Sequence, residues 1–292
     1  MQSMTAAAQR NLQSSQARLA GFQQSAMDLK KIPRISADPA AAADAMAVRA
    51  QQAATAQYGR NIADGSNWLT AADTALASST VLLQRAKDLA LQGANGATTP
   101  QGKEAIAAEL DTIGKDLMQQ ANTQYLGRSI FAGNSSQGAA YLGEPPSFTG
   151  DGSTVERRIS ATATIRVDAD GAAIFGRDNS DGKGDSVFGL LKAIADALRS
   201  GGDVASHLGD LDKAADTVVD ARSALGARHA QLLRAQDANA NGAVDLENQR
   251  SGIEDLDLSK AILDVKTQEL AYQAALSVTS KVLQPTLMDF LR

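Results

Sequence analysis

Apolar and small side chains recur at alternating steps of three and four residues near the start of the chain. They stand at positions 12, 15, 19, 22, 26 and 29, which is the spacing of a coiled-coil seam on one face of a helix. Pro33 disfavours helical backbone at the residue before it, so we expect this helix to end near Ile32. The pattern therefore predicts an N-terminal amphipathic helix whose seam needs a partner.

A second helical stretch begins at Asp38 and Pro39. A carboxylate followed by proline is typical of an N-cap and the first helical residue, so Asp38 and Pro39 are predicted to cap this helix. Apolar and small residues keep a heptad spacing from position 69 to position 90, which predicts a helix from Pro39 to about Gln92. Residues 64–67 read Asp-Gly-Ser-Asn, the weakest helix-forming stretch of this helix, which leaves room for a kink or bend.

A third helix is predicted from Pro100 to near Gly127, after which the composition changes. Residues 127–189 contain many of the chain's glycines and aromatic residues, and residues 159–167 alternate apolar with polar side chains. Arg128 to Gly133 reads as a strand, and Asp170-Gly171 is a hairpin turn signal. This segment predicts a small β subdomain.

The helical pattern returns at residues 186–199 and continues as a seam over residues 208–232. Further on, apolar residues form two stripes of seven-residue spacing side by side on one helix. A helix with two stripes is apolar over a broad face and needs partners on more than one side. The first stripe is Leu256, Leu263 and Leu270, and the second is Leu258, Val265 and Tyr272.

These elements predict a mainly α fold with a small β insert: a long antiparallel coiled-coil or helical-bundle rod with paired termini and the β subdomain at its distal end. We expect three structural domains. Residues 1–36 with 250–292 would form a terminal coiled-coil assembly domain, residues 37–127 with 186–249 a helical rod, and residues 128–185 the β subdomain.

Composition agrees with thin helical layers. Alanine, the best helix former, buries little surface, and only 4% of the 292 residues are aromatic. The net charge of −5 offers no basic face for nucleic acid, so no nucleic-acid partner is expected. The lack of cysteine excludes disulfides and thiolate chemistry. We see no apolar run long enough to span a membrane and no cleavable signal peptide, and we expect no membrane partner.

Candidate chemistry is weak. Residues 237–248 match several ligand positions of a calcium-binding loop, but Asn248 stands where the bidentate glutamate belongs. Residues 176–183 approach a phosphate loop, but Gly184 replaces the magnesium-binding hydroxyl residue. His207 and His229 lie on predicted helical stretches without a cluster of carboxylates, and Trp68 is interpreted as a packing anchor. We therefore expect no enzyme, no cofactor and no metal site.

Several strings of residues resemble the flagellin superfamily, in order along nearly the whole chain. Ile35-Ser-Ala-Asp-Pro39 resembles its N-terminal signature, and Gly127 to Gly133 resembles the passage from its helical domain into its β domain. Residues 221–228, 254–257 and the ending Leu287-Met-Asp-Phe-Leu291 are similar to its C-terminal part. Within the superfamily, the chain is most similar to the hook-associated protein 3 family of the hook–filament junction.

The resemblance implies a structural adaptor, outside the cell on the bacterial flagellum, exported by the flagellar type III apparatus without a cleaved signal peptide. The implied partners are further copies of the chain in a ring, the neighbouring hook-associated junction protein, flagellin and an export chaperone. Terminal helices would form the subunit contacts. The assembly interface is expected to include Leu12, Leu19, Phe22, Leu29, Leu256, Leu263, Leu270, Tyr272 and Phe290.

Two alternatives stay open on the residues alone. Filament flagellin would share the terminal helices, although Phe131 to Gly133 and the C-terminal ending favour the adaptor. A calcium-regulated helical binding protein, a different class, rests only on residues 237–248.

Overall fold

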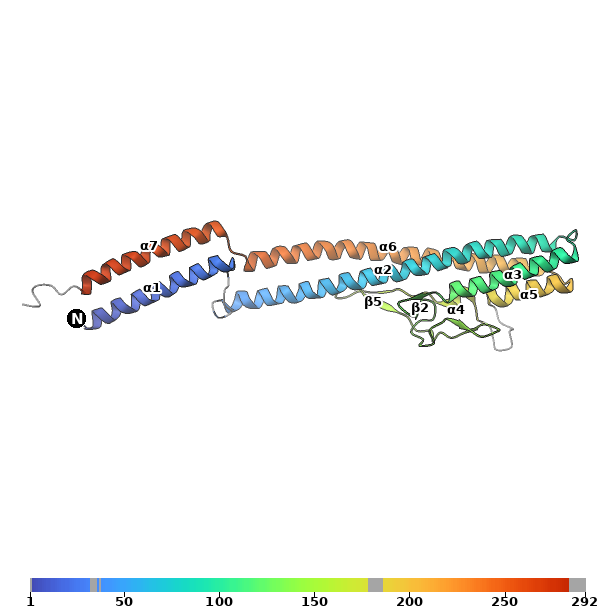
Figure 1. Cartoon of the computed structure of the whole chain (residues 1–292), viewed down its shortest axis with the longest axis horizontal. Coiled ribbons are helices and arrows are strands. Elements are labelled where there is room, and N and C mark those ends of the chain that lie inside the picture. Colours follow the sequence, from blue (N-terminus) through green and yellow to red (C-terminus); the bar gives the residue numbers. More distant parts are fainter. Residues whose placement is uncertain (1, 32–35, 37, 178–185, 284–292) are drawn as a thin grey trace, which may run out of the picture. The chain divides into compact units, whose positions relative to one another are not determined.

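A computed structural model of the chain describes residues 2–31, 36, 38–177 and 186–283. The expected fold class, mainly α with a small β insert, is confirmed (Figure 1). The chain forms two compact units: a terminal unit of residues 1–54 and 241–292, and a central unit of residues 55–240. The helices are α1 Gln2–Asp28, α2 Pro39–Ala94, α3 Pro100–Ala121, α4 Gly171–Phe175, α5 Val187–Ser200, α6 Ala205–Glu254 and α7 Leu258–Leu283.

Two of these helices, α2 and α6, are long enough to contribute to both units. Helix α2 continues through residues 64–67 without a break. Packing outweighs the poor propensity of this stretch. Gly65 allows close approach, since a Cβ at this position would lie 3.1 Å from Val167 Cγ1 and 3.4 Å from Leu232 Cδ1.

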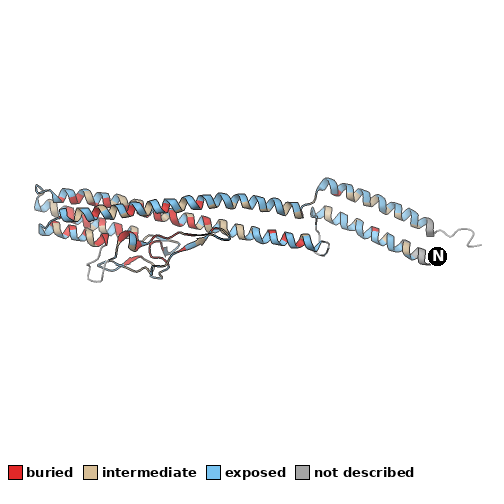
Figure 2. Cartoon of the chain, turned by 180° about the vertical axis from the view of Figure 1, so that it is seen from behind, coloured by how far each residue is buried: buried red, intermediate tan, exposed pale blue. Residues whose placement is uncertain are grey.

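The core of the central unit lies between α2, α3, α5 and α6. One leucine from each helix illustrates this core, since Leu76, Leu110, Leu191 and Leu211 are at most 1% exposed. Figure 2 shows the buried positions concentrated in this unit. Local caps define the shorter helices. Thr99 Oγ1 accepts a hydrogen bond from Gly102 N at 3.2 Å before α3, and Ser186 Oγ accepts one from Gly189 N at 3.0 Å before α5.

Helix α3 ends at Ala121, so the expected end near Gly127 is wrong. The following residue, Asn122, directs the chain into the β region. Its Nδ2 donates to Tyr141 O at 2.9 Å, and its Oδ1 accepts from Tyr141 N at 2.8 Å and Ala140 N at 2.9 Å. The Asn122 side chain thus binds the backbone of the β region at the point where the helix ends.

In the described part of the chain, the β region forms three antiparallel pairs of short strands and not one sheet. Between the first two strands, Leu126 and Gly127 both have positive φ angles, as a two-residue hairpin turn requires. The strands are β1 Gln124–Tyr125 with β2 Arg128–Ser129, β3 Tyr141–Leu142 with β4 Ser147–Phe148, and β5 Glu156–Arg158 with β6 Thr164–Arg166.

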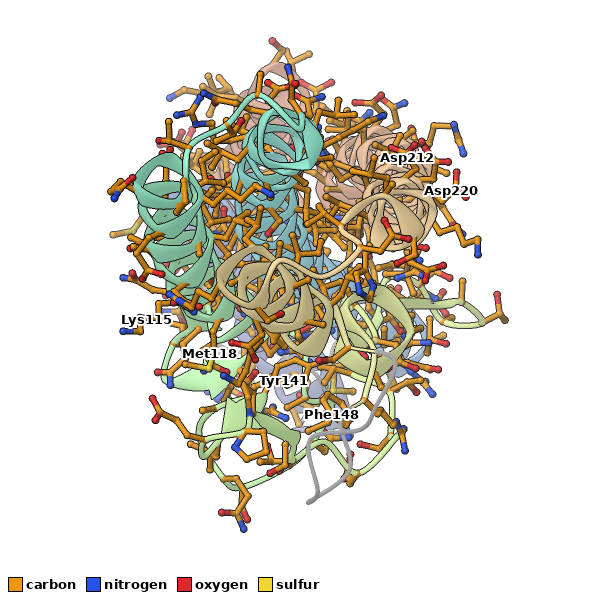
Figure 3. The ribbon with its side chains drawn as sticks, turned by 90° about the vertical axis from the view of Figure 1, so that its right-hand side faces the viewer. Lys115, Met118, Tyr141, Phe148, Asp212 and Asp220 are labelled. Carbon is orange, nitrogen blue, oxygen red and sulfur yellow. The ribbon has the colours of Figure 1, made fainter. Side chains whose placement is uncertain are left out.

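Aromatic side chains fill the space between these strands and the helices. The rings of Tyr141 and Phe188 are 4.9 Å apart and those of Tyr141 and Phe148 5.4 Å apart. Figure 3 shows Tyr141 and Phe148 on the β side of the central unit and Asp212 and Asp220 on α6. The expected hairpin turn at Asp170 is wrong: its Oδ1 accepts from Ala172 N at 3.0 Å and caps α4.

The β region is anchored to α2 at Trp68, which is 1% exposed. The guanidinium groups of Arg128 and Arg157 lie 5.7 Å and 5.5 Å from the centre of its ring. Arg157 Nε also forms an ion pair with Asp64 Oδ2 at 2.6 Å. These contacts place part of the β region against α2 at Asp64 and Trp68.

Candidate assembly surface

In the terminal unit, α1 and α7 pack against each other as an antiparallel pair. The seam is small and partly polar: Ser15 is 7% exposed and Ala261 5% exposed. Opposite Ser15 lies Gln268, whose Nε2 donates to Ser15 Oγ at 3.1 Å. Because a polar pair is satisfied in only one alignment of two helices, this contact favours a single register.

The two stripes of α7 have different surroundings. Val265 and Tyr272 are half-buried on the side that faces the seam. At 3.6 residues per turn, Leu263 and Leu270 lie on the opposite side of the helix, and they are 67% and 66% exposed. The pairing of α1 with α7 therefore partly covers Val265 and Tyr272 and leaves Leu263 and Leu270 open, while Leu258 at the start of α7 is also exposed.

Other predicted interface residues are distributed along the pair. Leu12 and Leu19 are half-buried in the seam, and Phe22 is 39% exposed at its edge. Leu29 lies just beyond the end of α1 and is exposed, whereas Leu256 is half-buried just before α7. Phe290 lies outside the described residues.

The end of α1 differs from the sequence expectation. The helix ends at Asp28 and not near Ile32, because Leu29 adopts a left-handed backbone with φ of +54°. Ten residues on, Asp38 Oδ1 accepts a hydrogen bond from Ala41 N at 3.0 Å, and Pro39 is the first residue of α2. This is the geometry of an N-cap followed by proline.

Two short segments of the terminal unit pair with each other: residues 29–31, which follow α1, and residues 254–256, which lie where α6 ends and α7 is about to begin. We call this pair of segments the joint. Lys31 N donates to Glu254 O at 2.8 Å, and Leu256 N donates to Leu29 O at 3.1 Å. Lys30 and Asp255 thus form an antiparallel β bridge. The joint connects the α1–α7 pair to the adjoining ends of α2 and α6 within this unit.

A buried carboxylate stabilises the joint. The side chain of Glu254 is 7% exposed, and its carboxylate oxygens lie 2.7 Å from Arg49 Nε and 3.3 Å from Arg250 Nη1. The hydrogen bond from Arg49 lowers the pKa of Glu254, and the Arg250 charge acts in the same direction. No local pattern of the sequence indicates this cluster, because Arg49 and Glu254 are 205 positions apart.

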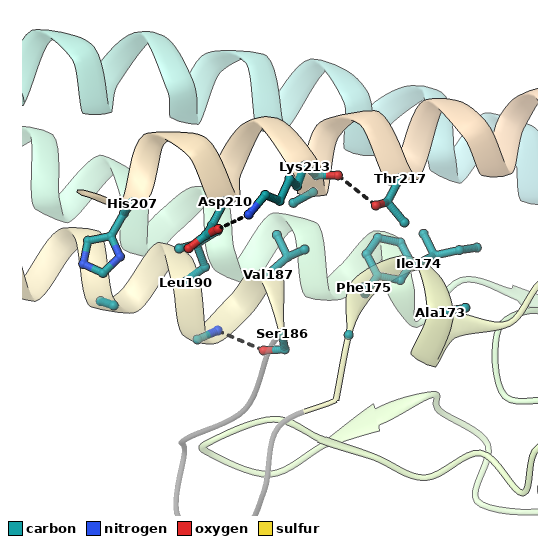
Figure 4. A pocket seen from close by; sticks show the side chains of 14 residues that line it. Ala173, Ile174, Phe175, Ser186, Val187, Leu190, His207, Asp210, Lys213 and Thr217 are labelled. Carbon is teal, nitrogen blue, oxygen red and sulfur yellow. Dashed lines mark hydrogen bonds and ion pairs between the residues drawn. The ribbon is translucent and has the colours of Figure 1, made fainter. Parts of the chain in front are cut away.

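The other candidate sites lie in the central unit or in α6. A cavity of about 540 Å³ between α4, α5 and α6 is lined by His207, Asp210 and Lys213 (Figure 4). Lys213 Nζ and Asp210 Oδ1 form an ion pair at 2.9 Å, which lowers the pKa of Asp210. His229 Nε2 lies 3.1 Å from Ser66 Oγ. In neither place do the described side chains form a relay of nucleophile, base and orienting carboxylate.

The calcium-loop interpretation is wrong, since residues 237–248 lie within α6 and a helix cannot wrap its side chains around one ion. No group of three histidine or acidic side chains that could hold a metal occurs in the described residues. The phosphate-loop candidate falls largely on residues 178–185, outside the described part. Among the described helices, none has the length and apolar character needed to cross a membrane.

Comparison with protein families gives two matches. Residues 1–136 match the bacterial flagellin N-terminal helical region, and residues 208–291 match the bacterial flagellin C-terminal helical region. The two matched regions together include α1, α2 and α7 and nearly all of α6.

Individual proteins are similar over most of their length. Flagellar hook-associated protein 3 of Salmonella typhimurium is 24% identical over 84% of both chains. The protein of that name from Escherichia coli is 23% identical over 91% of this chain and 90% of its own. Flagellin FlaB2 of Treponema pallidum is 22% identical over 88% and 85%.

Solved structures share the fold. A flagellar hook-associated protein from Vibrio parahaemolyticus superposes with a TM-score of 0.68 at 22% identity, covering 75% of this chain and all of that one. The flagellar junction protein FlgL from Legionella pneumophila superposes with a TM-score of 0.59 at 15% identity, covering 73% of this chain and all of that one.

Proposed function

The chain belongs to the bacterial flagellin family, and from this premise we propose that it is a structural adaptor of the flagellum. In this proposal, it joins the hook-associated junction to the flagellin filament through ring-forming contacts between helical subunits. The observation that carries the proposal is the exposure of Leu263 and Leu270 on α7, which stay uncovered when α1 and α7 pair. An apolar helix face of this kind favours burial against a neighbouring subunit.

Similarity to named proteins supports the adaptor over the filament flagellin. The relatives named hook-associated protein 3 match this chain over 84% and 91% of its length. The superposed hook-associated structures are covered completely, so their helical and β parts together correspond to the fold seen here. Filament flagellin remains the second candidate, because FlaB2 is 22% identical to this chain.

The domain organisation remains a prediction. In the proposed adaptor, residues 1–36 with 250–292 form the assembly domain, residues 37–127 with 186–249 the rod and residues 128–185 the β subdomain. The assembly contacts would come from both faces of the α1–α7 pair: one face within the chain and one toward neighbours.

The family places the chain among the structural components of the flagellum. We further propose that it is exported without a cleaved signal peptide and that a flagellar chaperone escorts it before assembly. Its proposed partners in the flagellum are copies of itself, the preceding junction protein and flagellin, with no nucleic-acid or membrane partner.

A deletion strain distinguishes the adaptor from the filament protein. Without an adaptor, cells should still synthesise and secrete flagellin but fail to retain filaments on their hooks. Electron microscopy of the cells and analysis of the culture medium measure both quantities. Absence of flagellin from the medium and from the cells would favour the filament protein.

The exposed stripe can be tested by Leu263→Asp, which places a charge in the proposed subunit contact. The variant should be secreted and helical, because Leu263 is already exposed in the single chain. It should not support filament retention, because the new charge lies in the proposed contact between subunits. Gln273→Asp, a matched change at an exposed polar position of α7, should retain filaments. Circular dichroism checks helicity, and loss of helix throughout the L263D monomer would contradict the interpretation.

A further inference from the structure

The sequence contains two Asn-Gly dipeptides in different structural settings. Asn95-Gly96 lies in the loop between α2 and α3, and Asn241-Gly242 lies within α6. Such a dipeptide is chemically labile when its backbone is free to bend. The two sites therefore provide a comparison within one molecule.

The reaction needs no enzyme and no cofactor. The backbone nitrogen of the glycine attacks the side-chain Cγ of the asparagine and forms a new N–C bond. Its proton passes to the side-chain amide nitrogen, whose bond to Cγ breaks, and this nitrogen leaves as ammonia. Water then opens the resulting succinimide at either carbonyl, giving aspartate or isoaspartate. Glycine favours the reaction because it has no Cβ to hinder ring closure.

The setting of Asn95 allows this ring closure. Asn95 and Gly96 are both exposed, and no atom lies within 4 Å of the position of a Cβ on Gly96. Asn95 Oδ1 accepts a hydrogen bond from Ala97 N at 3.1 Å, which polarises the amide carbon that would be attacked. Among the described residues, no acceptor is recorded for the Gly96 N–H, so its nitrogen is not held away from the side chain.

The setting of Asn241 opposes it. Gly242 lies in the interior of a 50-residue helix, where its N–H points along the helix axis toward the carbonyl of residue 238. Helical backbone holds this nitrogen away from the preceding side chain, and attack would require local unfolding of α6.

We propose that Asn95 is a site of spontaneous deamidation and that Asn241 is protected by its helix. The product carries a negative charge just beyond the C-terminus of α2, where the helix dipole disfavours an anion. The isoaspartate form also adds a methylene group to the main chain of the α2–α3 loop. The modification therefore accumulates with the age of the protein and alters this loop selectively.

Incubation of the full-length folded chain in neutral buffer, followed by peptide mapping with mass spectrometry, tests the proposal. The exchange of NH₂ for OH should be found at residue 95 while residue 241 stays unmodified. In concentrated urea the two sites should convert at similar rates, because both are then unfolded Asn-Gly dipeptides. Equal conversion of the two sites in the folded chain, or an intact Asn95, would overturn the proposal.

A variant links the modification to this mechanism. Gly96→Ala should slow conversion of Asn95 several-fold without changing helicity, since a Cβ at residue 96 meets no neighbouring atom and φ is not positive. Unchanged conversion at Asn95 in this variant would exclude attack by the backbone nitrogen of residue 96 as the rate-determining step.

Discussion

The central and terminal units are built from helices of the same apolar periodicity but differ in how many neighbours each helix has. In the central unit, four helices and the β region enclose side chains such as Trp68, Leu83 and Leu117, which are at most 1% exposed. Among the residues of α1 and α7 whose burial is described, those buried are Ser15 and Ala261, both small. The periodicity of apolar residues thus specifies that a helix packs along one face. The number of its faces that neighbours cover determines how much this packing stabilises the fold.

Hydrogen exchange should show the largest difference between the two units. Residues 69–90 of α2 should be protected by nearly the whole free energy of unfolding, about 5–15 kcal/mol for a typical domain. Residues 4–31 should exchange through local opening at far lower cost, because a lone helix pair buries too little apolar surface to offset its ordering entropy. Exchange of the isolated monomer, followed by mass spectrometry, measures this contrast. Equal protection of the two segments would remove it.

Leucine-to-alanine substitutions should destabilise the central unit strongly and the terminal unit hardly at all. Leu117→Ala deletes a fully buried side chain and should destabilise the central unit by about 2–5 kcal/mol. Leu270→Ala, on the exposed stripe of α7, should change the monomer by less than about 0.5 kcal/mol. Urea unfolding followed by the fluorescence of Trp68, the single tryptophan, measures the first effect directly. A similar loss in both variants would mean that the α7 stripe is covered in the monomer.

The contact of the β region with α2 should contribute less to the free energy of unfolding than the core leucine Leu117 does. Arg157→Gln removes a cation over the Trp68 ring and an ion pair with Asp64, and should cost about 1 kcal/mol. The emission of Trp68 should shift to longer wavelength as the ring becomes more accessible to water. Arg158→Gln is the matched control, because Arg158 is exposed and contacts α2 only through its carbonyl oxygen. Identical spectra for the two variants would argue against the arginine–tryptophan contact.

The smallest effect is expected at the joint and depends on pH. The folded pKa of Glu254 is lowered, so its contribution is present above the unfolded value of about 4.3 and is lost as pH falls through the lower folded value. Glu254→Gln should remove this pH dependence and weaken the bridge at Lys31 and Leu256. Amide chemical shifts of these two residues, measured from pH 7 down to pH 3, report the change.

Glu247→Gln serves as the control for the joint, since Glu247 pairs with Arg250 but is 56% exposed. Its variant should keep the titration of the Lys31 and Leu256 amides. If both variants titrate alike, the bridge does not depend on the Glu254 carboxylate.

Much of the helical architecture follows from the sequence, because long apolar periodicity and capping residues act locally. Asp38 and Pro39 start α2. The two stripes of α7 were predicted to lie side by side on one broad face, but a separation of two residues places them on opposite sides of the helix. Local signals were misleading where distant residues intervene. The weak stretch around Gly65 stays helical because Val167 and Leu232 pack closely against it.

Parts of the candidate surface were not predictable from local patterns. The Glu254 cluster depends on arginines brought together from α2 and α6, and only the fold places Arg49 beside it. Asp170 shows a different limit: Asp-Gly suits a hairpin turn, but the same carboxylate is also a good helix cap, and the chain uses it as a cap. Residue type narrows the options, while tertiary packing selects among them.

The open leucine stripe of α7 makes the stability of the terminal unit a matter of mass action. Any partner that covers Leu263 and Leu270 only when α7 is folded adds a stabilisation that grows with the logarithm of its free concentration. For the proposed contact between copies of this chain, a melting temperature of this unit is defined only together with a protein concentration. Under that proposal dilution should lower it, whereas the transition of the central unit should stay at the same temperature.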